Sequence, residues 1–262
     1  MLKEYKIPEV YKFPLKILKN SKIDYVLFKQ TEKYNTPIGG LDILFKNNKD
    51  YKRAMNVLQK NKYQTYLTEK NEPFKTMMIK YEKEFMIILH LHRRIAWLGI
   101  KALNQYKVVQ RAKRLNPLVK IPSKEDQTLV HAAHILFENR RITPTEKKIF
   151  KNKNLNYNYI NSQLEDHGWK SNFYKLINKQ KLTLPLRSTL NLRTHILLKK
   201  QTIQFFTKRS SPKRKGALIA LIGPNGSGKS TLANESVKTY NKLFEKLKLK
   251  ANYFYFGWKP SL

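Results

Sequence analysis

The sequence predicts an α/β protein, in which a mixed α/β region with a helical extension precedes the first β-α-β unit of a parallel sheet. Short apolar runs bounded by polar residues, typical of strands, lie within residues 1–120. Apolar residues recur at helical spacing behind capping residues in residues 121–206. An apolar run, a glycine-rich loop and an amphipathic stretch then follow one another in residues 217–262.

The N-terminal region is expected to contain four strands and one helix. Residues 25–28 and 41–45 are short apolar runs that predict strands. Asp50 is the expected N-cap of a helix that begins beside it. The runs at 76–81 and 85–90 flank a short charged segment, which predicts a hairpin.

The helical extension carries three helix-start signals. Ser123 followed by Asp126, and Thr143 followed by Glu146, both fit the capping box that opens a helix. Ser171 is expected to cap a third helix. We therefore expect these residues to mark the beginnings of the helices in this region.

A basic linker is predicted at residues 207–216, which are rich in lysine, arginine and serine and have no apolar periodicity. After it, residues 217–222 form an apolar run that predicts a buried parallel strand, and residues 251–256 predict a second strand. A helix is expected between them. One β-α-β unit cannot cover both faces of its own sheet, so we expect residues 217–262 to be only the beginning of such a domain. Either the chain is a fragment of a longer protein, or the remaining strands have been lost.

The loop before that helix fits the phosphate-binding pattern G-x-x-x-x-G-K-[ST] in full. It consists of Gly223, Pro224, Asn225, Gly226, Ser227, Gly228, Lys229, Ser230 and Thr231. Glycines allow consecutive backbone N–H groups to turn toward a phosphate, and the following helix N-terminus favours the same anion. The pattern predicts ATP and Mg²⁺ as ligands, with Lys229 on the β- and γ-phosphates and the Ser230 hydroxyl on Mg²⁺. The alternative is a glycine-rich turn between two core elements.

Composition limits the class of protein. The chain has 262 residues and no cysteine, which excludes disulfides and thiolate metal sites. No apolar stretch approaches the roughly 18 residues of a membrane span. Residues 1–6 lead into no apolar segment of the kind found in a secretory signal. A cytoplasmic location is the expectation.

The formal net charge of +35 raises the question of a polyanionic partner. Between Asp166 and Glu235 the sequence has no acidic residue. Residues 167–215 are therefore a candidate surface for non-specific nucleic-acid binding. Lysine exceeds arginine, however, and the alternative is a composition that reflects an AT-rich genome.

Residues 217–260 resemble the beginning of thymidylate kinase-like P-loop enzymes, in which a strand is followed by G-x-x-G-S-G-K-[ST]-T-L-A and a long helix. Residues 226–233 follow that form. The resemblance implies transfer of the ATP γ-phosphoryl group to a nucleotide acceptor, with Lys229 as the catalytic residue. Those enzymes commonly end their second strand in Arg-Glu-Pro, where this chain has Trp258, Lys259 and Pro260. The loop also resembles that of transporter-type ATPases, and binding of ATP without catalysis is a further alternative.

The N-terminal region resembles nucleotidyltransferase-like domains, in which an Asp-x-Asp pair on one strand and an acid on a later strand hold Mg²⁺. Asp42 alone remains of the pair, and residues 89–94, which include His90 and His92, occupy the second site with histidine where an acid would be. Residues 122–126 match the start of the helical region of those domains. The resemblance implies a degenerate domain that binds or scaffolds.

Two histidine pairs are possible metal ligands. His90 and His92 lie on one face of an expected strand, and His131 and His134 lie at helical spacing. Zinc sites need three or four protein ligands, and spacing alone indicates no third ligand for either pair. Structural roles are therefore expected for all four.

Overall fold

The computed structural model describes residues 7–29, 40–70, 72–82, 85–97, 100–139, 141–151, 154–179, 181–183, 219–222, 226–244 and 250–253. The chain divides into two compact units. The first comprises residues 1–80 and 87–206, and the second comprises residues 81–86 and 207–262. The domain boundaries expected at 120, 206 and 216 stay predictions.

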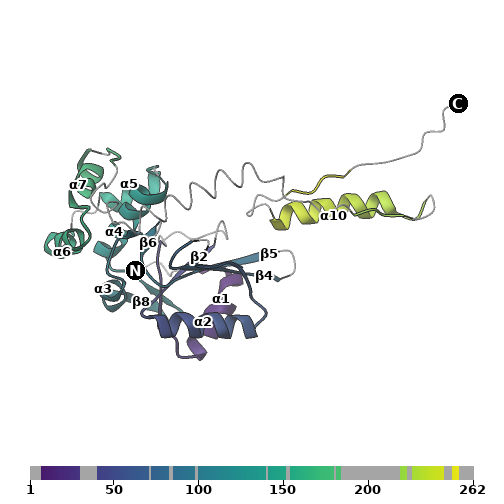
Figure 1. The fold of residues 1–262 in the computed structure, drawn as a ribbon, viewed down its shortest axis with the longest axis horizontal. Coiled ribbons are helices and arrows are strands. Elements are labelled where there is room, and N and C mark those ends of the chain that lie inside the picture. The colour runs from purple at the N-terminus through teal and green to yellow at the C-terminus, as the bar shows by residue number, and fades with distance from the viewer. Residues whose placement is uncertain are drawn as a thin grey trace. The chain divides into compact units, whose positions relative to one another are not determined.

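A mixed five-stranded sheet forms the centre of the first unit (Figure 1). Its spatial order is β1-β2-β5-β4-β3. The strands are β1 (Tyr25–Leu27), β2 (Leu41–Phe45), β3 (Gln64–Leu67), β4 (Lys75–Glu82) and β5 (Phe85–His92). β2 runs antiparallel to β1 and parallel to β5, and β3 runs antiparallel to β4. The strands predicted at 25–28, 41–45, 76–81 and 85–90 are thus confirmed.

Helices α1 (Glu9–Asn20) and α2 (Asn48–Lys60) pack on one face of this sheet (Figure 1). Successive strand residues point to opposite faces, and this face takes the odd-numbered members of β1 and β2. The core between them contains Tyr11, Leu15 and Leu18 from α1 and Tyr51, Ala54 and Leu58 from α2, with Tyr25, Leu27, Leu41, Ile43 and Phe45 from the sheet. The buried residues of α2 lie three and four positions apart, at 51, 54 and 58, and therefore share one face of the helix.

The N-cap of α2 is Asn47 and not Asp50. The Asn47 side-chain oxygen accepts a hydrogen bond of 2.8 Å from the Asp50 backbone N–H, and its backbone is extended. Asp50 lies in the first turn, where a carboxylate favours the positive end of the helix dipole. The prediction at Asp50 was therefore displaced by three residues, because asparagine and aspartate are both strong caps.

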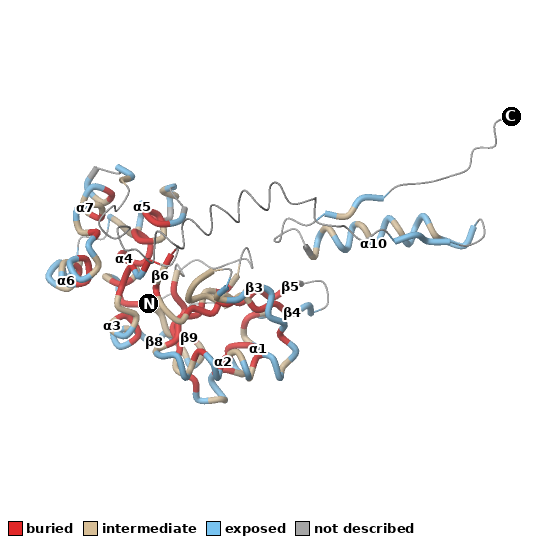
Figure 2. Tube along the Cα trace, viewed as in Figure 1, coloured by how far each residue is buried: buried red, intermediate tan, exposed pale blue. Residues whose placement is uncertain are grey.

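The opposite face of the sheet is covered by the helical part of the first unit. Val26, Phe28 and Leu44 share one hydrophobic core with the helices that follow the sheet, and this core includes Trp169. The elements that contribute to this core are β6 (Ala96–Trp97), β7 (Ile100–Lys101), α3 (Gln105–Arg111), α4 (Lys124–His134), a π-helical turn (Ile135–Asn139), α5 (Pro144–Phe150), α6 (Tyr157–His167) and α7 (Lys170–Lys179). The hairpin of β8 (Lys113–Asn116) and β9 (Val119–Ile121) instead packs through Val119 against the core beneath α1 and α2. Figure 2 shows buried residues on both sides of the sheet.

Capping in the helical part partly follows the prediction. The Thr143 hydroxyl and the Glu146 side chain form the expected reciprocal capping box at α5. Ser123 caps α4 by accepting from the Asp126 backbone N–H. The Asp126 carboxylate binds the Ser123 hydroxyl and not its backbone N–H, so no reciprocal box is formed there. Ser171 is the second residue of α7, which begins at Lys170, so its predicted role as a cap was wrong.

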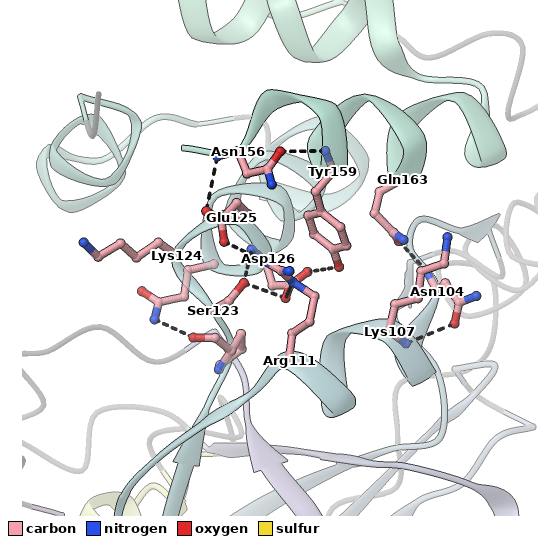
Figure 3. A network of polar contacts seen from close by, with 12 residues as sticks. Asn104, Lys107, Arg111, Ser123, Lys124, Glu125, Asp126, Asn156, Tyr159 and Gln163 are labelled. Carbon is pink, nitrogen blue, oxygen red and sulfur yellow. Dashed lines mark hydrogen bonds and ion pairs between the residues drawn. The ribbon is translucent and has the colours of Figure 1, made fainter. Parts of the chain in front are cut away.

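A buried polar network around Asp126 joins α3, α4 and α6 (Figure 3). The Asp126 carboxylate accepts hydrogen bonds from the hydroxyls of Ser123 (2.7 Å) and Tyr159 (2.6 Å). The Arg111 guanidinium lies 4.0 Å from the centre of the Tyr159 ring and pairs with Glu125 at 2.8 Å. Burial raises the pKa of Asp126, while the Tyr159 and Ser123 hydrogen bonds act in the opposite direction.

In the second unit, the helix expected after the loop is α10 (Lys229–Phe244). The flanking strands of the predicted β-α-β unit are not formed in the described residues: neither 219–222 nor 251–253 lies in a strand. Ile219 and Ile222 are 81% and 95% exposed. Strand propensity alone does not make a strand, because the backbone also needs a neighbouring strand and the apolar side chains need cover. Residues 217, 218 and 254–256 lie outside the described parts.

No helix among the described residues is long and apolar enough to cross a membrane.

Candidate functional site

The described part of the phosphate-loop motif runs from Gly226 into α10. Gly226 and Gly228 both have a φ of 78°, in the left-handed region that favours glycine. An added Cβ at either position would meet no atom within 4 Å, so the requirement for glycine comes from the backbone and not from crowding. Gly223, Pro224 and Asn225 lie outside the described residues.

The second half of the motif opens α10 directly. Lys229 is the first residue of the helix, and the Leu232 backbone N–H donates to the Gly228 carbonyl at 2.9 Å. The first N–H groups of a helix have no partner within it, so the N-terminus favours an anion. The Lys229 ammonium donates to the Ser227 hydroxyl at 3.3 Å, which keeps its charge beside the loop. Ser230 is exposed in the first turn.

A second group of polar residues lies in the sheet of the first unit. Asp42 on β2 is paired with His90 on the parallel strand β5, and His92 lies two residues further along β5. Residues that are paired across two strands, or separated by two along one strand, point to the same face. The parallel register of β2 and β5 therefore brings one carboxylate and two imidazoles together.

The three side chains meet around one carboxylate oxygen. His92 Nε2 lies 2.8 Å from Asp42 Oδ1, and His90 Nδ1 lies 3.5 Å from the same oxygen. One ligand atom from each residue lies within 4.8 Å of the other two. The His92 side chain is only 4% exposed, whereas those of Asp42 and His90 are 13% and 18% exposed. The cluster is thus buried at His92 and accessible to solvent at its His90 side.

Lys29 supplies a cation beside this cluster. Its Nζ lies 3.4 Å from Asp42 Oδ1 and 3.9 Å from Glu138 Oε2. Burial disfavours the charged form of Lys29, but the Asp42 and Glu138 carboxylates and the hydrogen bond to Asp42 together outweigh it and raise the pKa of Lys29. Burial would raise the pKa of Asp42, yet the Lys29 charge and the hydrogen bonds from His90 and His92 together hold it well below its usual range. Both groups are therefore charged at neutral pH.

His92 remains neutral in this environment. Burial lowers its pKa to about 3, and the hydrogen bond and charge of Asp42 only partly offset that effect. Its ring also packs edge-on against Phe28, with 4.5 Å between the ring centroids. A neutral imidazole has one nitrogen that accepts a proton or a metal ion.

The structure corrects the expectation that no third ligand lies near His90 and His92, because Asp42 places a carboxylate oxygen beside both. The spacing of residues along the chain did not reveal it, since Asp42 comes from another strand. The resemblance to nucleotidyltransferase-like domains places Asp42 and the segment 89–94 at the metal-binding positions of those domains, and this was the available signal. His134 instead pairs with Glu138 at 3.2 Å, and His131 lies 3.9 Å from Glu146.

Comparisons of the chain with protein-family models, with curated proteins and with solved structures found no match.

Proposed function

We propose that this protein binds ATP·Mg²⁺ at the loop of residues 223–231. The observation that carries the proposal is a complete phosphate-loop sequence in which Gly226 and Gly228 adopt positive φ and lead directly into the N-terminus of α10. Positive φ lets the backbone N–H groups of such a loop point inward around a phosphate, and the helix dipole favours the same charge.

Two side chains have the chemistry that the phosphates need. The Lys229 ammonium, held near the loop by Ser227, would contact the β- and γ-phosphate oxygens. The exposed Ser230 hydroxyl would be a ligand of Mg²⁺, which bridges the same phosphates. Lys229 would supply one positive charge to the triphosphate, and Ser230 would help to hold the Mg²⁺ that supplies two more.

Beyond ATP binding, we propose that the protein transfers a phosphoryl group from ATP to a nucleotide or a related acceptor. It is supported by the resemblance of residues 226–233 to the loop of thymidylate kinase-like enzymes. In that reaction Lys229 would stabilise the negative charge of the transferring phosphoryl group. Lys259 would meet an acceptor phosphate as a point charge, because lysine cannot make the bidentate contact of arginine.

The test compares two lysines of the same helix. Lys229→Ala should weaken ATP·Mg²⁺ binding at least ~30-fold, about 2 kcal/mol, since a charge-assisted contact is lost. Lys238→Ala is the matched control: it removes an equal charge from α10, where Lys238 pairs with Glu235 at 2.8 Å, and should leave affinity unchanged. Isothermal titration calorimetry measures both. Equal affinity in the Lys229→Ala and native proteins would contradict the proposal.

Transfer is tested separately from binding. The full chain is incubated with ATP, Mg²⁺ and a set of nucleoside monophosphates, and formation of the diphosphate is followed by chromatography. Product that disappears in Lys229→Ala supports a kinase. If the protein binds ATP tightly but forms no diphosphate with any acceptor, it is a nucleotide-binding protein and the kinase proposal is refuted.

An ATPase that acts on nucleic acid is the second candidate, favoured by the absence of acidic residues between Asp166 and Glu235. Binding through residues 167–215 would be electrostatic. The logarithm of the binding constant should therefore fall steeply and linearly with the logarithm of the salt concentration. Fluorescence anisotropy with a single-stranded oligonucleotide measures that slope. Absence of binding at low salt would exclude this candidate.

A further inference from the structure

We propose that Asp42, His90 and His92, none of which belongs to the phosphate-loop motif, form a binding site for one divalent transition-metal ion of the zinc type. The site lies on the face of the sheet that also carries Leu44, and β2 and β5 supply its ligands.

The separation of the three ligand atoms suits one small ion. They lie within 4.8 Å of one another, and Asp42 Oδ1 is 2.8 Å and 3.5 Å from the nearest nitrogens of His92 and His90. An ion held at about 2.0–2.2 Å from each ligand in a tetrahedral arrangement separates ligand atoms by about 3.3 Å. Shifts of less than about 1 Å in the side chains would therefore create the site, which is within rotamer adjustment.

The cluster is held in place before any ion arrives. All three ligands come from adjacent strands, whose hydrogen bonds fix the backbone separation. The ring of His92 is fixed against Phe28. The ring of His90 lies over Gly40, where an added Cβ would come within 2.9 Å of His90 Nε2. Gly40 is thus the residue that allows the His90 ring to lie where it does.

The ligand types select the class of metal. Mg²⁺ and Ca²⁺ prefer sites built from oxygen ligands, whereas imidazoles suit Zn²⁺ and its neighbours in the first transition row. Two imidazoles and one carboxylate form the three-ligand set found at zinc sites that keep a further position for water. His90 lies at the accessible side of the cluster, so solvent can reach that position.

Lys29 sets the affinity of the site. Its ammonium lies 3.4 Å from Asp42 Oδ1, so an incoming dication meets a repelling charge. The same side chain also lies 3.9 Å from Glu138 Oε2, and it can keep that carboxylate as its partner when Asp42 binds the metal. Removal of the Lys29 charge should therefore strengthen metal binding, which a purely structural ion pair does not predict.

The first experiment uses the full chain without nucleotide and titrates it with Co²⁺, whose visible absorption reports coordination by imidazole. We expect one Co²⁺ per chain, displaced by Zn²⁺ and not by Mg²⁺. His90→Gln should weaken Co²⁺ binding at least ~100-fold, because one of three ligands is lost. His167→Gln is the matched control, because His167 lies in α6 and its ring contacts the Gln163 carbonyl instead of the cluster. The Co²⁺ affinity of this variant should equal that of the native protein. Absence of a Co²⁺ spectrum in the native protein, or unchanged binding in His90→Gln, overturns the proposal.

The second experiment tests the role of Lys29. Lys29→Met keeps the aliphatic side chain and should raise Co²⁺ affinity at least ~10-fold by removing a charge close to Asp42. Far-UV circular dichroism with and without Zn²⁺ establishes whether the variant folds. A variant that folds only when Zn²⁺ is present supports the site, because binding to the native state stabilises it. Affinity equal to or below that of the native protein, or a variant that Zn²⁺ does not rescue, counts against it.

Discussion

Replacement of Tyr159 by phenylalanine removes a single hydroxyl from the network in Figure 3. That hydroxyl donates a 2.6 Å hydrogen bond to the buried carboxylate of Asp126. A hydrogen bond to a charged group contributes about 1.5–3 kcal/mol to stability. The phenyl ring can still lie against the Arg111 guanidinium, so little apolar area is lost. We expect the free energy of unfolding to fall by about 2 kcal/mol at neutral pH.

The pH dependence of this loss follows from the sign of the shift at Asp126. Burial raises the pKa of Asp126 in the folded state. Between the pKa of the unfolded state and that of the folded state, the folded protein therefore binds more protons than the unfolded protein. The contribution of this carboxyl group to stability consequently falls as the pH rises through the pKa of the folded state. The Tyr159 hydrogen bond lowers that pKa, and Tyr159→Phe therefore raises it further. The difference in stability between native and variant should consequently be smaller near pH ~4, where carboxyl groups protonate, and larger at pH ~7.

Urea unfolding followed by far-UV circular dichroism measures both values, with the m-value as a check that the unfolded state is unchanged. Tyr157→Phe is the matched control, since Tyr157 is 43% exposed in the same helix and should change stability by less than about 0.5 kcal/mol. The reasoning fails if Tyr159→Phe costs no more than the control, or if its cost is equal at both pH values.

Three further outcomes follow from the structure. Trp169→Phe should lower the free energy of unfolding by about 2–4 kcal/mol in thermal or urea unfolding, because Trp169 is fully buried and its Nε1 donates to the Ala102 carbonyl at 2.9 Å. A loss below about 1 kcal/mol would contradict this prediction. Asn47→Ala should cost about 1 kcal/mol through loss of the α2 cap, and Asn47→Asp should restore most of it. Gly228→Ala should weaken ATP binding measured by calorimetry, because an L-residue resists a φ of 78°, and unchanged affinity would show that this conformation is not used.

The sequence predicted local structure well where residues only a few positions apart determine it. The Thr143 capping box and the strands at 41–45 and 85–90 depend on residues a few positions apart, and both are found. The cap at Asp50 was displaced to Asn47, because two residues three positions apart can both accept the same kind of hydrogen bond.

The candidate sites differ in how far the chain alone could reveal them. The candidate phosphate loop is contiguous in the sequence, so its motif can be recognised there without knowledge of the fold. The cluster of Asp42, His90 and His92 depends on the pairing of β2 with β5, which residue spacing does not specify. The strand predicted at 217–222 is not formed in the described residues, and Ile219 and Ile222 are exposed. An apolar run indicates side chains that favour burial, but it does not specify the element that would cover them.

The alternation along β1 and β2 has a practical consequence for dissecting this protein. Val26, Phe28 and Leu44 contact the core that contains Trp169, while Leu27, Ile43 and Phe45 contact the core beneath α1 and α2. A recombinant fragment ending near residue 120 would leave the first set exposed on one broad apolar surface and would be prone to aggregate. Expression fragments intended for crystallisation should therefore carry the sheet and the helices through α7 together.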